Sequence, residues 1–141
     1  KIAVRVLGEQ TKKFPSLSLT PRAAGTGLSG GSLTDSVVID VVKHLNQIGK
    51  VHESQSGITV TCEPGAMWKD VESELKKHDV YLPPFPASKD ICTIGGAVAN
   101  NSAGPDSLRF GQVADWIESL QIVLHDGNMY EVRPLNYKEY K

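Results

Sequence analysis

The residues best suited to chemistry lie in a short glycine-rich stretch near the start of the chain. Four glycines occur between Gly25 and Gly31. A glycine has no Cβ, so the backbone N–H groups around it can converge closely on an anion. Arg22 adds a positive charge that suits a phosphate group. A turn between strands needs only one or two glycines, so this density favours an anion-binding loop. The stretch also carries the hydroxyl groups of Thr26, Ser29 and Ser32.

By its letters alone, the segment from Gly25 to Gly30 matches the G-x-G-x-x-G fingerprint of dinucleotide-binding folds. That fingerprint requires a helix directly after the last glycine, because the helix N-terminus faces the pyrophosphate. Here a β-branched run follows instead. Asp40 also comes only about half as far on as the roughly 20 residues that a ribose-binding acid requires. A nicotinamide-binding Rossmann fold is therefore rejected. A P-loop is rejected as well, because no Gly-Lys-Ser/Thr follows the glycines.

A second glycine-containing turn precedes a run of small residues that is expected to be helical. Its sequence is Thr93-Ile94-Gly95-Gly96. The N–H groups and the dipole of such a helix N-terminus are predicted to favour another part of the same anion. The polar residues Asn100, Asn101 and Ser102 follow and could bond the ligand. Two donor-rich loops predict a ligand with an extended phosphate bridge, and a dinucleotide with a pyrophosphate fits that description.

Periodicity predicts the helices that must position these loops. The first is expected from Ile2 to Lys13, because the following Phe14-Pro15 stops the pattern. In residues 68–78, side chains spaced by three and four form one helix face, with Trp68 as a core anchor. The stretch from Thr93 to Ala99 is expected to pass from a turn into the small-residue helix, which Gly104-Pro105 is expected to end. Residues 81–90 hold three prolines, so no regular element is expected there.

Short strands are predicted from alternating or β-branched runs. They cover residues 16–20, 37–40, 49–53, 58–63, 116–124 and 129–132. Gly57 separates the third from the fourth, and Asp126-Gly127 separates the last two, so each of these pairs is predicted to be an antiparallel hairpin. Helices and strands mix without strict βαβ alternation, so the predicted fold class is α+β.

The composition excludes several function classes. The chain of 141 residues is 40% hydrophobic and 22% charged, as expected for a soluble domain. A net charge of −1 offers no broad basic surface for nucleic acid. No apolar run approaches the ~20 residues that span a bilayer. The histidines are scattered and Cys62 lies far from Cys92, so no metal site or disulfide is predicted, and two reduced thiols favour a cytoplasmic protein.

One long motif runs from Pro21 to Gly31 and a second from Leu82 to Gly96. Together they resemble the FAD-linked oxidase family, whose FAD-binding domain is of the PCMH type (the vanillyl-alcohol oxidase fold). Glu63-Pro64-Gly65 and the segment 123–127 also match the pattern. The motifs are most similar to those of D-lactate dehydrogenases and of the flavin-binding chain of glycolate oxidase. The resemblance covers nearly the whole chain.

The resemblance implies non-covalent FAD, bound along both motifs. Relatives with covalent FAD use a histidine about where Thr26 stands, and threonine cannot form that bond. The chain departs from the family pattern at Ser102-Ala103 and Phe110, which affects detailed flavin contacts and not the cofactor. The implied cofactor-binding residues are Arg22, Ala24, Gly25, Thr26, Gly27, Leu28, Ser29, Gly30, Pro84, Ser88, Thr93, Gly95, Gly96, Asn100, Ala103 and Gly104.

The family fold comprises two small α+β subdomains followed by a substrate domain. Lys1 in place of methionine and the charged end at Lys141 indicate that residues 1–141 are a partial FAD-binding domain, truncated at both ends. The catalytic residues are unknown and are expected beyond Lys141. No oligomeric state is predicted, and peripheral association with the inner membrane stays open.

The implied function is the FAD-binding portion of an enzyme that oxidises a 2-hydroxy acid of the D-lactate, glycolate or D-2-hydroxyglutarate type. Its partners would be a small-molecule substrate and an unknown electron acceptor. Two alternatives remain, an FAD-linked oxidase of another alcohol or sugar and a non-catalytic nucleotide-binding module, because a fold does not fix a substrate.

Overall fold

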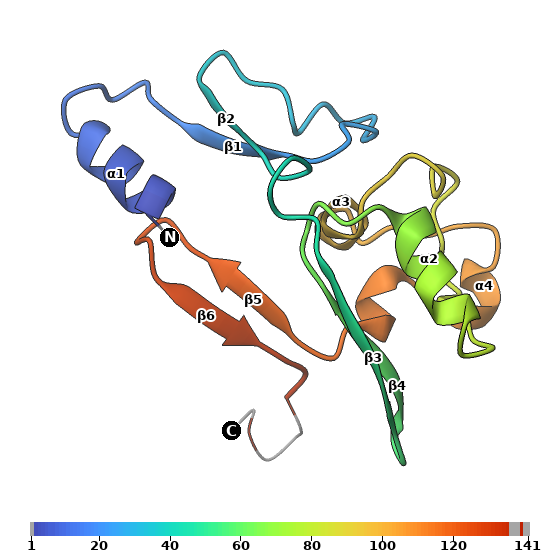
Figure 1. Cartoon of the computed structure of the whole chain (residues 1–141). Helices are drawn as coiled ribbons and strands as arrows, with labels where there is room; N and C mark the ends of the chain where they lie inside the picture. The colour runs from blue at the N-terminus through green and yellow to red at the C-terminus, as the bar shows by residue number, and fades with distance from the viewer. Residues whose placement is uncertain (1, 136–138, 140–141) are drawn as a thin grey trace. The chain divides into compact units, whose positions relative to one another are not determined.

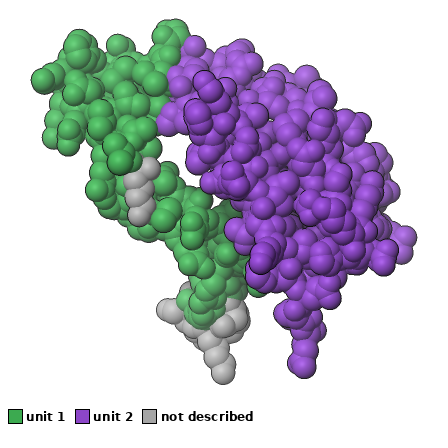
Figure 2. Space-filling model, viewed as in Figure 1, with its two compact units in different colours: residues 1–19, 35–37, 116–141 green, residues 20–34, 38–115 purple. Residues whose placement is uncertain are grey.

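The computed structural model describes residues 2–135 and 139, which divide between two compact units (Figures 1 and 2). Unit 1 contains the described residues of segments 1–19, 35–37 and 116–141. Unit 2 contains segments 20–34 and 38–115. Helices and strands occur in both, so the predicted α+β class is confirmed. Lys1 and Lys141, where the sequence predicts cut ends, lie outside the described residues.

Unit 1 is built from one helix and one hairpin. Helix α1 spans Ile2–Gln10, and strands β5 (Leu120–Val123) and β6 (Met129–Val132) pair antiparallel. Gly127 takes a φ of +75° in the connecting turn, as the Asp-Gly signal predicts. The Arg5 side chain donates to Asn128 Oδ1 at 3.1 Å and so links the helix to this turn.

Two boundaries predicted in unit 1 are wrong. Helix α1 ends at Gln10 and not at Lys13, because the N–H groups of Lys13 and Phe14 both turn back to the Gln10 carbonyl at 2.9 Å. The strand predicted from Trp116 begins only at Leu120, which pairs with Val132 at the end of β6. Register with the partner strand therefore sets the limits of β5.

A sheet of two strands, β1 (Leu19–Arg22) and β2 (Val37–Asp40), frames the first glycine loop. The Val37 N–H donates to Ser18 O at 3.1 Å, and the Val41 N–H donates to Arg22 O at 3.0 Å. Both strands advance in the same direction between these bonds, so the pair is parallel. Parallel neighbours require a long crossover connection, and residues 23–36 supply it.

Strand β1 differs from its predicted range of 16–20. It begins at Leu19 and continues through Pro21, which the sequence places as its end. Proline lacks a backbone N–H and is accepted in a strand with one paired edge. Among the described residues β1 has β2 as its only neighbour, so the other edge needs no donor from Pro21.

The core of unit 2 forms between a hairpin and a helix. Strands β3 (Ile48–Ser54) and β4 (Gly57–Cys62) pair antiparallel, as predicted, and helix α2 (Trp68–Lys76) packs against them (Figure 1). The buried side chains of α2 are Trp68, Val71 and Leu75, which is the predicted face without His78. His78 lies in the following turn, where its Nδ1 is 2.8 Å from Glu53 Oε1.

The remaining helices are short. Helix α3 (Ile94–Ala99) ends before the predicted Gly104-Pro105 stop, because Asn101 leaves the helix with a φ of +42°. Helix α4 (Ser107–Phe110) and the 3₁₀ turn Val113–Trp116 are too short for a periodic signal and were not predicted. Residues 81–90 form no helix or strand, as expected. In residues 2–135 and 139, no helix is long and apolar enough to cross a membrane.

Trp68 is expected to be the residue on which unit 2 depends most, since it is the largest side chain with almost no exposed surface. Replacing it with alanine should lower the free energy of unfolding by about 3–5 kcal/mol, because a large cavity replaces its packing contacts. Trp116→Ala serves as the control, because Trp116 is 45% exposed. Urea unfolding followed by circular dichroism measures both, and equal losses would contradict this account of the core.

Candidate functional site

All of the predicted cofactor-binding residues lie in unit 2, in four segments of the chain. The first is the crossover loop between β1 and β2. Within the described structure, no backbone N–H group from Ala24 to Ser32 donates to another group of the protein. The one backbone bond of this stretch closes a turn from Leu33 N–H to Gly30 O at 2.9 Å. The loop thus keeps a row of free donors, as predicted from its glycines.

The side chains of the loop add to this donor set. The hydroxyls of Thr26, Ser29 and Ser32 make no hydrogen bond within the described part of the chain. Arg22 is exposed and forms no ion pair there. It is also the one charged residue between Thr20 and Thr34. The loop therefore has the electrostatic character of an anion site, and no carboxylate pairs with Arg22 in the described structure.

The base of the loop meets helix α3, so the structure brings the two glycine motifs together. A Cβ placed on Gly96 would lie 3.8 Å from the Cβ of Ala23. Residues separated by most of unit 2 are therefore neighbours in the fold, close enough that an alanine at position 96 would contact Ala23. The sequence predicts that both motifs hold one ligand, and their proximity agrees with that prediction.

The N-terminus of α3 differs from the sequence-based argument in one respect. Its first N–H groups already have partners: Ile94 donates to Ala66 O and Gly95 to Pro64 O, both at 2.9 Å. Gly96 donates to Thr93 Oγ1 at 3.1 Å. The expectation that these N–H groups face an anion is therefore wrong. The Cβ of an alanine at Gly95 would be 2.5 Å from Pro64 Cβ, so this glycine permits close packing.

The proline-rich segment before α3 is largely inside the molecule. Pro84 and Thr93 are each less than 2% exposed, so they shape the surroundings and do not face solvent. Ser88 is half-buried, and its carbonyl accepts the N–H groups of Ile91 and Cys92 at 2.9 Å. The segment thus acts as a support under the exposed loop residues.

The fourth segment follows α3 and contains a structural residue that the sequence misassigned. Asn101 was expected to be able to bond the ligand, but its side chain holds the chain together. Its Nδ2 donates to Gln112 Oε1 at 2.7 Å, and its Oδ1 accepts the Ala114 N–H at 2.9 Å. Ser102 is buried, whereas Asn100 and Ala103 are exposed. The positive φ of Asn101 has no sequence signal beyond the tolerance of asparagine for that region.

Gly104 is also fixed by packing. A Cβ at this position would collide with the carbonyl oxygen of Phe85. The close approach joins the segment after α3 to the proline-rich segment. Gly95 and Gly104 are therefore required by backbone contacts, while a Cβ on Gly27 would meet nothing within 4 Å. The predicted site glycines thus fall into two physical kinds.

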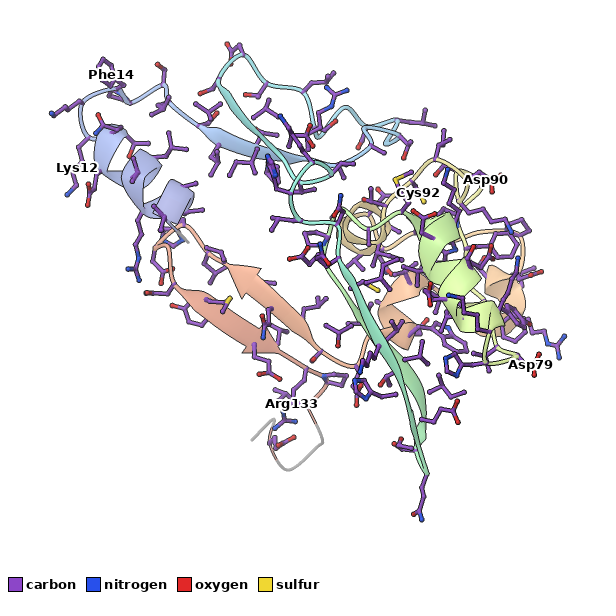
Figure 3. All side chains as sticks on the ribbon, viewed as in Figure 1. Lys12, Phe14, Asp79, Asp90, Cys92 and Arg133 are labelled. Atoms are coloured by element: carbon purple, nitrogen blue, oxygen red, sulfur yellow. The ribbon has the colours of Figure 1, made fainter. Side chains whose placement is uncertain are left out.

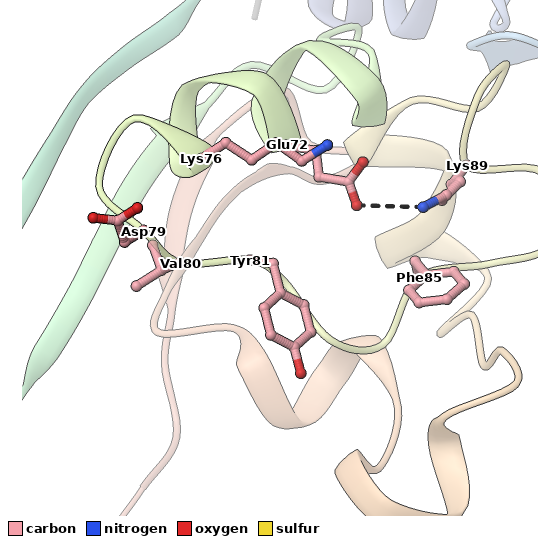
Figure 4. Close-up of a pocket in the computed structure, with 7 residues that line it drawn as sticks. All are labelled: Glu72, Lys76, Asp79, Val80, Tyr81, Phe85 and Lys89. Carbon is pink, nitrogen blue, oxygen red and sulfur yellow. Dashed lines mark hydrogen bonds and ion pairs between the residues drawn. The ribbon is translucent and has the colours of Figure 1, made fainter.

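An open hollow of about 530 Å³ lies between helix α2 and the proline-rich segment of unit 2 (Figure 4). Lys89 Nζ lies 3.5 Å from Glu72 Oε1 at its side, and 4.5 Å from the centroid of the Phe85 ring. Two acidic and two basic residues balance each other, so the hollow has no excess charge for a phosphate. It shares no residue with the predicted site. It is lined by Glu72, Lys76, Asp79, Val80, Tyr81, Phe85 and Lys89.

The two cysteines are not poised as nucleophiles. Burial raises the pKa of the Cys62 thiol to about 11. Burial also raises the pKa of Cys92, which lies in the segment leading into α3 (Figure 3). A reactive cysteine requires a lowered pKa. Among residues 2–135 and 139, no group of three His, Cys, Asp or Glu side chains could hold a metal ion.

The fold and the site define an α+β domain with a donor-rich loop for an anionic ligand. The family model described as "FAD binding domain" matches residues 4–133. The chain belongs to this FAD-binding family, which confirms the predicted family and the predicted cofactor, FAD.

Comparison with individual proteins agrees. D-2-hydroxyglutarate dehydrogenase of Pantoea ananatis (strain AJ13355) is 30% identical over 134 residues, which is 95% of this chain and 13% of that protein. Glycolate oxidase subunit GlcD of Bacillus subtilis (strain 168) is 34% identical over 112 residues, 79% of this chain and 23% of that protein. The chain therefore spans less than a quarter of the length of either relative.

Solved structures confirm the fold. Alkyldihydroxyacetonephosphate synthase matches 99% of this chain and 28% of its own, with a TM-score of 0.74 and 25% identity. 6-Hydroxy-D-nicotine oxidase from Arthrobacter nicotinovorans matches 92% of this chain and 28% of its own, with a TM-score of 0.69 and 16% identity, and shows the fold alone. Proteins with different names thus share this architecture.

The Thr93 hydroxyl is expected to matter as the cap of α3. Thr93→Val keeps the shape but removes the acceptor for the Gly96 N–H. Losing the cap and leaving that donor without a partner should lower the free energy of unfolding by about 1–2 kcal/mol. Thr93→Ser is the matched control and should retain most of the stability. If urea unfolding gives the valine variant no loss, or a loss no larger than that of the serine variant, the Thr93 hydroxyl does not stabilise α3 as a cap.

Proposed function

We propose that this chain is the FAD-binding part of a flavin-dependent oxidoreductase that oxidises a 2-hydroxy acid. The observation that carries the proposal is the loop from Ala24 to Ser32, whose N–H and hydroxyl donors have no partner in the described structure. Such a donor set, with Arg22 beside it, suits the diphosphate of FAD. When bound, FAD supplies the hydride acceptor, and the protein supplies binding and orientation.

The other predicted site residues take two roles in this proposal. Gly96 and the exposed Asn100, Ala103 and neighbouring backbone would lie along the cofactor. Pro84, Thr93, Gly95 and Gly104 would hold these segments in place, since they are buried or packed against their neighbours. The half-buried Ser88 would do the same through its carbonyl, which accepts the N–H groups of Ile91 and Cys92. Thr26 cannot form the covalent link that a histidine forms, so binding is non-covalent.

The names of the relatives support the substrate class. They include D-2-hydroxyglutarate dehydrogenase, glycolate oxidase subunit GlcD and a D-lactate dehydrogenase from Archaeoglobus fulgidus. Each of these names refers to a 2-hydroxy acid. The proposal assigns no catalytic residue and no electron acceptor. The alternatives are an FAD-linked oxidase of another alcohol or sugar and a non-catalytic nucleotide-binding module, because a fold does not fix a substrate.

Gly27→Val is expected to weaken FAD binding by at least about ten-fold, or about 1.4 kcal/mol. The branched side chain would occupy the space where the phosphate approaches the backbone. The fold should tolerate it, because a Cβ at Gly27 meets nothing within 4 Å and no positive φ is required there. FAD titration by flavin fluorescence, on the protein at its native length, gives the dissociation constants.

Gly8→Ala is the control for a glycine substitution outside the site. Gly8 lies in α1, where a Cβ would be 4.0 Å from the nearest atom, His125 O. Its FAD affinity should equal that of the wild type. A folded Gly27→Val protein with wild-type FAD affinity would show that the loop does not contact the cofactor.

The substrate class is tested by reduction of an artificial electron acceptor. D-2-hydroxyglutarate, glycolate and D-lactate are each supplied to the FAD-loaded protein at its native length. At least one should be oxidised, and the corresponding L-2-hydroxyglutarate and L-lactate serve as stereochemical controls. Turnover of simple alcohols or sugars with none of the three acids would select the alternative oxidase, and a protein that binds no FAD would exclude both.

A further inference from the structure

The position of the Arg22 side chain depends on a glycine three residues later. A Cβ placed on Gly25 would lie 2.9 Å from Arg22 Nη2, and 3.3 Å from both Cζ and Nε. The guanidinium therefore lies against Gly25, in the space that a side chain would fill. Any other residue at position 25 would have to displace it.

The backbone of Arg22, from which the side chain extends, is held in place as well. Arg22 is the last residue of β1, and its carbonyl accepts the Val41 N–H at 3.0 Å. The sheet thus sets where the side chain begins, and Gly25 sets where it can end. No ion pair or hydrogen bond to a described residue holds the guanidinium. Its donors remain available to a ligand.

Two constraints favour glycine at position 25, the backbone φ and the nearby Arg22 guanidinium. Its φ of +72° lies in the left-handed region that favours glycine. Gly30, at the other end of the same loop, has the same φ of +72°. There a Cβ would meet Leu33 Cδ1 at 3.5 Å, an ordinary contact. An alanine at either position would therefore have the same backbone strain, but its methyl group would meet a different neighbour.

We propose that Gly25 is a positioning residue that acts through Arg22: it seats the guanidinium beside the loop so that the guanidinium binds the cofactor's diphosphate together with the free N–H groups. The proposal rests on the proposed FAD-binding function. Arg22 is the single cation between Thr20 and Thr34, so it carries the charge-dependent part of the binding. A lysine would retain the charge but not the planar fork of donors.

A double-mutant cycle tests this coupling. FAD dissociation constants are measured on the protein at its native length for wild type, Arg22→Gln, Gly25→Ala and the double variant. Arg22→Gln should weaken binding about ten-fold or more, as expected for loss of a charge-assisted hydrogen bond. Gly25→Ala should weaken binding by a similar factor in the wild type. In the Arg22→Gln background it should have almost no further effect.

Gly30→Ala is the matched control, since it imposes the same φ without touching Arg22. Whatever factor it costs should be the same in the wild-type and Arg22→Gln backgrounds. Thermal unfolding should show similar losses for Gly25→Ala and Gly30→Ala, because the backbone strain is shared. Arg22→Gln should also flatten the dependence of FAD affinity on NaCl concentration, which a purely structural role would leave unchanged.

Each outcome decides the proposal. If Gly25→Ala weakens FAD binding by the same factor with and without Arg22, Gly25 does not act through Arg22 and the proposal is wrong. The same follows if Arg22→Gln leaves the affinity and its salt dependence unchanged. A wild-type protein that takes up no FAD would instead overturn the proposed function itself. That failure is visible before any variant is made.

Discussion

The structure of unit 2 depends on two backbone hydrogen bonds that hold the N-terminus of α3 in place. Pro64 O and Ala66 O accept the N–H groups of Gly95 and Ile94, and the Trp68 N–H returns a bond to Cys92 O at 3.0 Å. These bonds tie the start of α2 to the start of α3. They are possible because Gly95 has no Cβ to keep Pro64 away. With this junction in place, the base of the glycine loop can rest on α3 at Gly96.

Because of this junction, one part of the domain supports the structure and another part is available to bind a ligand. The donors of α3 are used inside the protein, while those of the loop from Ala24 to Ser32 are left free in the described structure. The parallel pairing of β1 with β2 explains why such a loop exists. A tight turn cannot connect parallel strands, so the crossover is long enough to present many backbone groups to a ligand. Few groups within the protein are available to bond them, and their N–H donors are left without a partner in the described structure.

This arrangement provides a cofactor site without committing the protein to one reaction. The relatives and solved structures that share the domain carry several names, including dehydrogenases of hydroxy acids and a synthase. A loop that holds a diphosphate is indifferent to what reacts at the far end of the cofactor. The described part of the chain holds neither a cysteine with a lowered pKa nor a group of three His, Cys, Asp or Glu side chains that could hold a metal ion.

The sequence by itself determined the features that follow from local chemistry. The hairpins at Gly57 and Asp126-Gly127 and the buried face of α2 led by Trp68 were predicted correctly, because turn conformation and side-chain spacing act over a few residues. The two motifs also identified the family. These predictions needed no knowledge of which segments meet in space.

Only the tertiary structure decided which glycines serve packing and which leave donors free. Gly95 and Gly27 look alike in the sequence, but Pro64 approaches one and nothing approaches the other. Asn101 was misassigned for the same reason: its partners Gln112 and Ala114 come from a segment that local patterns do not connect to it. The contact between Arg22 and Gly25 likewise depends on how β1 directs a side chain over the loop. Contacts of this kind depend on where the folded chain brings its segments, and no pattern of neighbouring residues records that.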